Sequence, residues 1–347
     1  MKTKYAIIGQ GLAGSFVAAQ LEKRGLSYVV INDEEDCSSS EVAAGVFNPL
    51  TGPKVVKTYL ADEIFPYSKL FFEEEEKRLG QKFIKETTVL KIFGSQEQQT
   101  DVLAKAEERY KDYIDTNPNT QLYSNKIQDK FGTINILKSG AIDTKAYIHS
   151  VRKFLKKKDK YSCKKIANDD FVYDNQKLNI KDIDAEHYIF CQGYHATEND
   201  LFSWLPFHPT KGEMILIEAD LPEQYIINKN CFILPKGNGQ FLVGASFSHK
   251  YDKELSKEGR DFLIKKLDDI LSVNYKIIEQ RVGIRPTVKD RKPYLGRHPE
   301  YSNIYILNGF GSKGVTLGPY FACHLIDFIE KDISLYKEVD INRYKKV

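Results

Sequence analysis

The chain has 347 residues, of which 41% are hydrophobic and 29% charged, as in an ordinary globular protein with one large domain or two intertwined ones. Its 51 basic and 48 acidic side chains leave a net charge of only +3, which argues against a nucleic-acid-binding protein and against attachment to a membrane surface. No segment has the uninterrupted apolar length of a membrane span.

The five cysteines are scattered, without CxxC spacing and without histidines close by. This pattern predicts a reducing compartment, which we take to be the cytoplasm, with no disulfide framework and no metal site. Cys163 and Cys191 lie in strand-like segments and are expected to be buried. The acidic run 73–76 and the basic run 156–158 are each expected to form the solvated face of a helix.

The first 31 residues predict strand, glycine-rich turn, helix and strand in succession. The apolar runs 5–8 and 28–31 are typical of buried parallel strands, and residues 15–24 have the spacing of a helix. Between them, Gly9 permits a tight turn, Gly11 allows the backbone to approach a pyrophosphate, and Gly14 allows close packing of helix and strand. We therefore predict a dinucleotide site at the N-terminus of this helix.

The residues that follow the second strand extend this expected site. An acidic side chain usually binds the adenosine ribose here, but Asn32 takes that position and Asp33 comes next, so the sequence leaves open which of the two makes the contact. The absence of an arginine cluster argues against a 2′-phosphate and hence against NADP. A helix-capping serine run and small residues that permit close backbone approach come next. The cofactor contacts expected from this part of the chain are Gly9, Gly11, Ala13, Gly14, Asn32, Asp33, Ser39, Ser40, Ala43, Ala44 and Gly45.

The middle of the chain alternates helices and strands. Amphipathic helices are expected at residues 61–79, 100–113, 143–157 and 258–271. Strands are expected within 83–93, at 171–173, at 178–180, at 186–191 and repeatedly from 211 to 247, with a hairpin turn at 237–239. The strand that ends at Gly193 is apolar enough to return to the dinucleotide sheet, so the nucleotide-binding elements lie at the two ends and the centre of the chain.

The C-terminal part contains two further motifs. Residues 283–296 fit the pattern G-[IL]-R-P-x-x-x-D-x-x-P-x-[IL]-G, and Arg285 is its arginine. After an apolar strand at 304–307, residues 309–319 form a second glycine-rich segment that opens the last long helix. Such a strand-to-helix turn is suited to direct a helix N-terminus toward another part of the same cofactor.

With these motifs the sequence closely resembles the D-amino-acid oxidase superfamily of FAD-dependent oxidoreductases, and within it glycine oxidase, over roughly the whole chain. The resemblance implies an α/β fold with a Rossmann-like FAD-binding domain and a discontinuous substrate domain of the α+β type with an antiparallel sheet. The expected FAD-binding segments are 1–60, 130–200 and 280–347. The expected substrate-binding segments are 61–129 and 201–279.

The resemblance also implies roles for single residues. Arg285 matches the arginine that binds the substrate carboxylate, and Lys313 takes the place of a second arginine near the site entrance. Cys191 stands where the family usually has alanine. No cysteine lies next to Arg285, so the FAD is expected to be non-covalent. The further cofactor contacts implied are Gly193, Gly311, Ser312, Lys313, Gly314, Val315 and Thr316.

The resulting functional hypothesis is oxidation of a small-molecule amine or amino acid by hydride transfer to flavin N5, which gives an imine that hydrolyses. The electron acceptor, oxygen or another compound, is left open. His195, His249 and His298 are candidate site residues, although single histidines are more often structural. The alternatives are a flavin module that acts on a modified tRNA wobble uridine and a non-catalytic flavoprotein. The late glycine cluster disfavours an NAD-dependent enzyme.

Overall fold

The two N-terminal apolar runs form adjacent parallel strands, as expected. The structure is a computed structural model that describes residues 2–34, 38–118, 123, 125–250 and 252–344. Its six-stranded sheet has the order β11-β2-β1-β14-β21-β20, in which only β20 runs antiparallel to its neighbour. These strands are β1 (Lys2–Ile8), β2 (Tyr28–Asn32), β11 (Tyr161–Cys163), β14 (Asp184–Phe190), β20 (Tyr294–Arg297) and β21 (Ile304–Asn308). The predicted return of the strand before Gly193 to this sheet is confirmed, because β14 pairs with β1.

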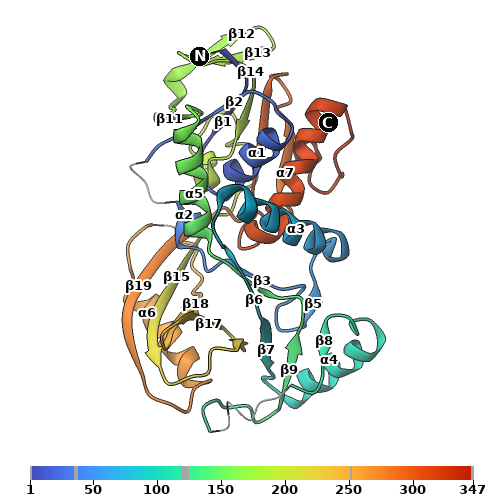
Figure 1. Ribbon diagram of the computed structural model, residues 1–347, viewed down its shortest axis with the longest axis vertical. Coiled ribbons are helices and arrows are strands. Elements are labelled where there is room, and N and C mark those ends of the chain that lie inside the picture. The colour runs from blue at the N-terminus through green and yellow to red at the C-terminus, as the bar shows by residue number, and fades with distance from the viewer. Residues whose placement is uncertain (1, 35–37, 119–122, 124, 251, 345–347) are drawn as a thin grey trace.

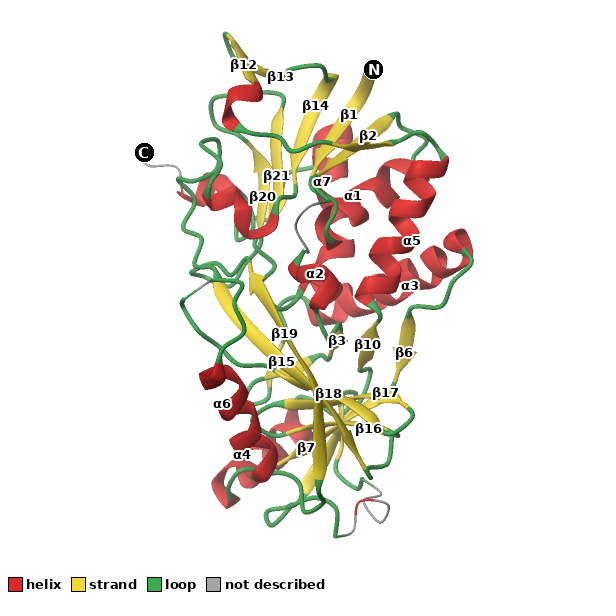
Figure 2. Ribbon diagram, turned by 90° about the vertical axis from the view of Figure 1, so that its left-hand side faces the viewer, coloured by secondary structure: helices red, strands yellow, loops and turns green. Residues whose placement is uncertain are grey.

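Helices cover one face of this sheet, and a hairpin covers part of the other. The helices are α1 (Leu12–Lys23), α3 (Ala61–Leu79), α5 (Thr144–Lys157) and α7 (Gly314–Lys331), and Figure 2 shows α1, α3 and α5 gathered beside β1 and β2. Tyr5 and Ile7 of β1 point into the core shared with these helices, whereas Ala6 and Ile8 point into the opposite core with β12 (Phe171–Asp174) and β13 (Lys177–Ile180). Burial on both faces explains the continuous apolar runs.

The second large sheet is mostly antiparallel and occupies the lower half of Figure 1. Its order is β19-β15-β18-β17-β16-β7-β9-β8, with β7 and β16 as its parallel pair. Helix α6 (Lys257–Asp268) packs on one face and α4 (Gln96–Glu108) on the other. Its strands are β7 (Thr88–Ile92), β8 (Ile114–Asp115), β9 (Thr133–Ile136), β15 (Thr210–Ala219), β16 (Tyr225–Asn228), β17 (Phe232–Gly237), β18 (Gln240–Gly244) and β19 (Tyr275–Arg285).

Small elements connect the two halves. A three-stranded sheet lies between the large sheets, as both views show, and α2 packs against β19. These and the remaining short elements are α2 (Ser39–Val42), β3 (Val46–Phe47), β4 (Leu50–Thr51), β5 (Val56–Lys57), β6 (Ile84–Glu86), β10 (Gly140–Ile142), η2 (Asn168–Asp170), η3 (Gly193–Thr197) and η4 (Ile341–Tyr344). The α/β fold with a parallel and an antiparallel sheet agrees with the prediction.

Several elements, among them α3 and β9, lie on the other side of the expected division between FAD-binding and substrate-binding segments. Helix α3 belongs to the core of the six-stranded sheet, where Ile64, Phe71 and Phe72 pack with α1, α5 and α7, although segment 61–129 was assigned to substrate binding. Strand β9 belongs to the eight-stranded sheet, although segment 130–200 was assigned to FAD binding. Where the domain boundaries fall stays a prediction.

Two burial expectations are wrong. Cys163 is exposed, because it ends the edge strand β11, whereas Cys191 is buried as expected. The acidic run is only half solvated, since Glu75 and Glu76 are buried among hydrogen-bond donors. The basic run 156–158 is exposed, as predicted. Cys37 lies outside the described residues.

Candidate functional site

The glycine-rich turn is closely packed at each of its three glycines. A Cβ added to Gly14 would lie 1.9 Å from the carbonyl oxygen of Gly9, and one added to Gly11 would lie 3.0 Å from Ser40 Oγ. Gly9 has a φ of +99°, and its Cβ would meet the carbonyl oxygen of Cys191 at 2.7 Å. Helix α1 begins directly after its N-cap residue Gly11, which has no side chain to cap it, and its first turn contains no acidic residue. Its open N–H groups and positive end fit a pyrophosphate.

The predicted residue Asn32 and two residues that the sequence did not indicate, Gln10 and Arg152, hold this turn in place. Asn32 Oδ1 accepts a hydrogen bond from the backbone N–H of Gln10 at 2.7 Å, so the amide of Asn32 supports the turn. The side chain of Gln10 accepts from Arg152 Nε at 2.7 Å, and Arg152 Nη2 donates to Glu41 of α2 at 3.0 Å. Arg152 thus joins α5, the turn and α2. Nothing in its lysine-rich helix indicated this role, because its partners lie more than 100 residues away.

The small-residue segment after α2 is also closely packed. Gly45 has a φ of +69°, and a Cβ there would lie 1.9 Å from the carbonyl oxygen of Ile142. The hydroxyl of Ser40 accepts from the backbone N–H of Leu12 at 3.2 Å, which brings α2 to the start of α1. On its other side α2 meets β19, since a Cβ on Gly283 would lie 2.7 Å from Val42 Cγ2. The segment therefore lies between the glycine-rich turn and the strand that ends at Arg285.

The second glycine-rich segment lies beside the same strand end. The backbone N–H of Gly311 donates to the carbonyl oxygen of Pro286 at 3.2 Å, directly after β19. Lys313 is the N-cap residue of α7, without a side-chain cap hydrogen bond. A Cβ on Gly314 would lie 3.3 Å from Leu12 Cδ1, so α7 and α1 start side by side. The sequence-predicted segments 9–14, 39–45 and 311–316 and Arg285 are therefore brought together.

Gly193 begins η3, just after the end of β14. Its φ is +58°, and its carbonyl oxygen accepts a hydrogen bond from Asn308 Nδ2 at 2.8 Å. Asn308 ends β21, so this bond joins the carboxyl ends of two neighbouring strands, where ligands of open α/β sheets bind.

Arg285 carries a positive charge with no acidic partner in the described part of the chain. Its Nη2 donates to the carbonyl oxygen of Ser246 at 3.3 Å and its Nη1 to that of Lys211 at 3.5 Å, both long hydrogen bonds. Desolvation lowers the pKa of Arg285, and no carboxylate offsets it. Lys313 is similar: burial and then repulsion from Arg291 lower its pKa, and no ion pair with a described residue compensates. Both cations are suited to bind an anionic ligand.

The three candidate histidines have partners of their own. His298 is buried, with Nε2 at 2.9 Å from the carbonyl oxygen of Leu201 and Nδ1 accepting from the backbone N–H of Glu300 at 3.1 Å, so it is structural. His195 pairs with Glu198 at 3.2 Å, and the His249 ring packs against Phe247. Among the described residues, no three or more His, Cys, Asp or Glu side chains gather as a metal site would require. No helix in the described ranges is long and apolar enough to cross a membrane.

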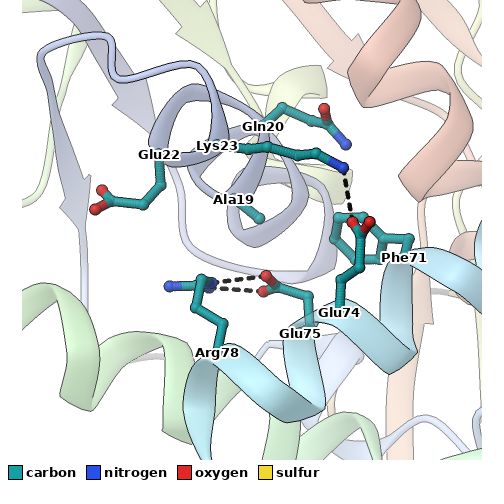
Figure 3. Close-up of a pocket in the computed structure, with 8 residues that line it drawn as sticks. All are labelled: Ala19, Gln20, Glu22, Lys23, Phe71, Glu74, Glu75 and Arg78. Carbon is teal, nitrogen blue, oxygen red and sulfur yellow. Dashed lines mark hydrogen bonds and ion pairs between the residues drawn. The ribbon is translucent and has the colours of Figure 1, made fainter.

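A cavity of about 300 Å³ lies elsewhere, between α1 and α3 (Figure 3). Its charged side chains are already paired: Lys23 with Glu74 at 2.7 Å, Arg78 with Glu75 through two hydrogen bonds of 2.7 and 2.6 Å, and Glu22 with Lys160 at 2.6 Å. Arg285 is not among its lining residues. The cavity therefore offers a ligand no unpaired charge, unlike the region around Arg285.

The chain is similar to known proteins in sequence and in fold. The family model of FAD dependent oxidoreductases matches residues 4–327. Glycine oxidase from Bacillus subtilis is 32% identical over 169 residues, which is 45% of this chain and 45% of that protein, so the match spans less than half of the relative's length. Iminodiacetate oxidase from Chelativorans sp. BNC1 has the same fold, with a TM-score of 0.80 at 20% identity over 98% of both chains. Glycine oxidase from Geobacillus kaustophilus follows with a TM-score of 0.78 at 20% identity over 96% of both.

The family match, the glycine-rich turn that the cofactor requires and the relatives' shared fold agree with one another. The chain belongs to the FAD dependent oxidoreductase family, as a glycine oxidase-like member of the D-amino-acid oxidase superfamily with FAD as its cofactor.

Proposed function

We propose that the protein oxidises a small amine or amino acid that carries a carboxylate, and that Arg285 binds this carboxylate. The observation that supports the proposal best is the half-buried guanidinium of Arg285, which has no acidic partner among the described residues and only two long hydrogen bonds to carbonyl oxygens. Burying a cation without a counter-charge is costly, so such a group is retained where a ligand supplies the charge. A planar fork of N–H donors matches the two oxygens of a carboxylate.

The residues at the two helix starts fit the cofactor. The N-terminus of α1 would hold the pyrophosphate of a non-covalent FAD, and the segment 311–316 at the start of α7 would face the flavin. Bound FAD supplies a hydride acceptor that takes two electrons and the hydrogen from the α-carbon. The resulting imine then reacts with water to give an oxo acid and ammonia or an amine.

The protein's own part in the reaction is binding and orientation. Arg285 holds the carboxylate, which fixes the α-carbon next to it. Half-buried Ala44, Val46, Phe232 and Ala245 pack against the core of the eight-stranded sheet, and Ala245 precedes Ser246, whose carbonyl oxygen contacts Arg285. Apolar surroundings exclude water and strengthen the ion pair with the substrate. If the amine binds neutral, no protein base has to remove its proton.

A substrate with two carboxylates is a second candidate, favoured by Lys313. This lysine is a second desolvated cation without an ion pair in the described ranges, two residues from the Gly311 hydrogen bond to Pro286. The relative from Chelativorans is an oxidase of iminodiacetate, a secondary amine with two carboxylates. Anaerobic bleaching of the flavin by glycine, N-methylglycine and iminodiacetate would rank these substrates. Bound FAD that no amine bleaches would favour the non-catalytic alternative.

Replacement of Arg285 by alanine tests the proposal. Truncating one partner of a desolvated charge pair costs about 2–5 kcal/mol, so kcat/KM should fall by roughly 30- to 5000-fold at about 1.4 kcal/mol per tenfold. Arg285→Lys should recover only part of the activity, because an ammonium lacks the planar fork. FAD content should stay unchanged in both variants.

Arg281 is a matched control on the same strand. It pairs with Glu279 through two hydrogen bonds of 2.7 Å on the surface, so Arg281→Ala should leave turnover unchanged. Wild-type kcat/KM for the best amino acid in Arg285→Ala would contradict the proposed carboxylate contact and point to a substrate without a carboxylate.

A further inference from the structure

The strand beside Arg285 has no side chain at the point where the guanidinium crosses it. In the antiparallel register of β15 and β19, Thr210 pairs with Arg285 and Gly212 with Gly283. A Cβ added to Gly212 would lie 1.9 Å from Arg285 Nη2, 2.2 Å from Cζ and 2.6 Å from Nη1. Gly212 is absent from the glycines with positive φ, so its backbone does not require glycine. The space taken by the guanidinium is therefore the steric reason for glycine at this position.

Two backbone carbonyl groups orient the same guanidinium. They belong to Ser246, which accepts from Nη2 at 3.3 Å, and to Lys211, which accepts from Nη1 at 3.5 Å. Hydrogen bonds between the two chain segments keep these groups in place. The backbones of Lys211 and Ser248 exchange bonds of 2.9 and 3.1 Å, and Ser246 N–H donates to the carbonyl oxygen of Glu213 at 2.9 Å. Guanidinium has five N–H donors, so the two long bonds leave donors for a ligand.

The nearest buried carboxylate on β15 is directed to other partners. Successive side chains of a strand point to opposite faces, so Glu213 lies on the face opposite Gly212. Its carboxylate accepts hydrogen bonds from the backbone N–H of Ser256 at 2.6 Å, from Ser256 Oγ at 2.7 Å and from Gln280 Nε2 at 3.2 Å. Glu213 thereby holds the start of α6, and the charge of Arg285 remains available to a substrate.

We propose that Gly212 is a positioning residue for carboxylate binding: its missing side chain lets the Arg285 guanidinium lie against β15 with its free N–H edge toward the substrate. The inference rests on the proposed role of Arg285. Ordinary contact between heavy atoms is about 3.5–4.0 Å, so a methyl group at Gly212 must displace Nη2 by about 1.5–2 Å. A shift of about 1 Å in a binding group is enough to lower turnover by about 100-fold.

Gly212→Ala tests the inference. Acetate serves as the probe, because it carries a carboxylate but no amine and is therefore not oxidised by the proposed reaction. Perturbation of the flavin spectrum gives the dissociation constant of acetate, and FAD content and unfolding temperature are measured beside it. We expect acetate to bind at least about 30-fold more weakly, as for loss of a charge pair, with FAD content unchanged. Gly94→Ala is the matched control, because its Cβ would meet only Gln98 Oε1 at 3.5 Å.

The double variant Gly212→Ala/Arg285→Ala separates positioning from a structural role. If Gly212 acts through Arg285, the double variant should bind acetate as weakly as Arg285→Ala and no more weakly, and should fold as well as that variant. Acetate binding that Arg285→Ala does not weaken would refute the proposed function itself. Weak binding in Arg285→Ala with wild-type binding in Gly212→Ala would refute the inference alone. A double variant that fails to fold or to hold FAD would also overturn it, because the methyl group would then clash with something other than the guanidinium.

Discussion

Among single residues, Gly14 offers a direct test of how the cofactor is held. Its Cβ position lies 1.9 Å from the carbonyl oxygen of Gly9, so Gly14→Val must move α1 away from the end of β1 and disturb the turn between them. We expect FAD to bind at least about tenfold more weakly, which corresponds to about 1.4 kcal/mol. Fluorescence titration of the apoprotein with FAD measures the change. An unchanged dissociation constant would show that this turn does not hold the cofactor.

Single residues also show which contacts a sequence motif can reveal and which it cannot. Gly9, Gly11 and Gly14 follow from local spacing, because each is needed within one strand-turn-helix unit. Gly212 has no motif around it, and its steric role depends on Arg285, which lies 73 positions further along the chain. A glycine that serves a distant side chain looks the same in a sequence as one in an ordinary strand.

At the scale of elements, the C-terminal end of α3 carries two carboxylates with different roles. Glu76 Oε1 accepts from the backbone N–H groups of Phe83 at 2.6 Å and Ile84 at 2.9 Å, whereas Glu74 is half exposed and pairs with Lys23. Glu76→Ala leaves backbone donors unsatisfied and should cost about 2–4 kcal/mol of unfolding free energy. Glu74→Ala should cost less than about 1 kcal/mol. Urea denaturation of the two variants compares them directly.

The buried carboxylate of Glu76 also predicts that the stability of the protein depends on pH. Burial by itself would raise the pKa of Glu76, but hydrogen bonds from Ile84, Lys82 and Phe83 outweigh it and hold the pKa below the ordinary value of 4.5. A carboxyl group whose pKa is lower in the folded state stabilises the protein above its unfolded-state pKa, and this contribution is lost as the pH falls through the folded-state pKa. The stability difference between wild type and Glu76→Ala should therefore be constant near neutral pH and shrink below about pH 4.5. A stability difference between the two proteins that stays constant down to pH 3 would contradict the prediction that Glu76 is ionised in the folded protein.

For the whole molecule, the candidate site is assembled from segments at both ends and in the middle of the chain. The segments 9–14, 39–45 and 311–316 meet around the end of β19, and β15 and the residues after β18 complete the surroundings of Arg285. The two large sheets therefore contribute to one site, the six-stranded sheet with the cofactor-binding turn and the eight-stranded sheet with the arginine.

This arrangement leads to a prediction about the intact holoprotein. No cysteine stands beside Arg285 in the sequence, and Cys231 is buried in the core of the eight-stranded sheet. Acid precipitation should therefore release the flavin into the supernatant, where chromatography should identify intact FAD. Flavin absorbance that remains with the pellet would indicate a covalent bond. Release of FMN would contradict the dinucleotide site.

Much of the architecture follows from local patterns. The helix predicted at 61–79 has the same bounds as α3, and Asp143, the first residue of the predicted helix 143–157, caps α5 by accepting a hydrogen bond from the backbone N–H of Ala146 at 3.0 Å. Amphipathic spacing and caps act within one or two helical turns, so the sequence displays them directly. The same holds for the dinucleotide fingerprint, whose parts lie within one βαβ unit.

Other features depend on contacts between distant segments. Strand β19 was not predicted, because it lies at the edge of its sheet, where residues such as Lys276 and Glu279 stay solvated and mask the apolar alternation. The sequence predicts that the acidic run of α3 forms a solvated face. In the structure, the loop after α3 brings backbone N–H donors to Glu76. The family motif identified Arg285, but its lack of an acidic partner among the described residues and its contact with Gly212 exist only where β15, β18 and β19 lie side by side. Neighbouring residues in the sequence determine helices, caps and turns. Charge pairing and steric fit depend instead on which strands the fold places side by side.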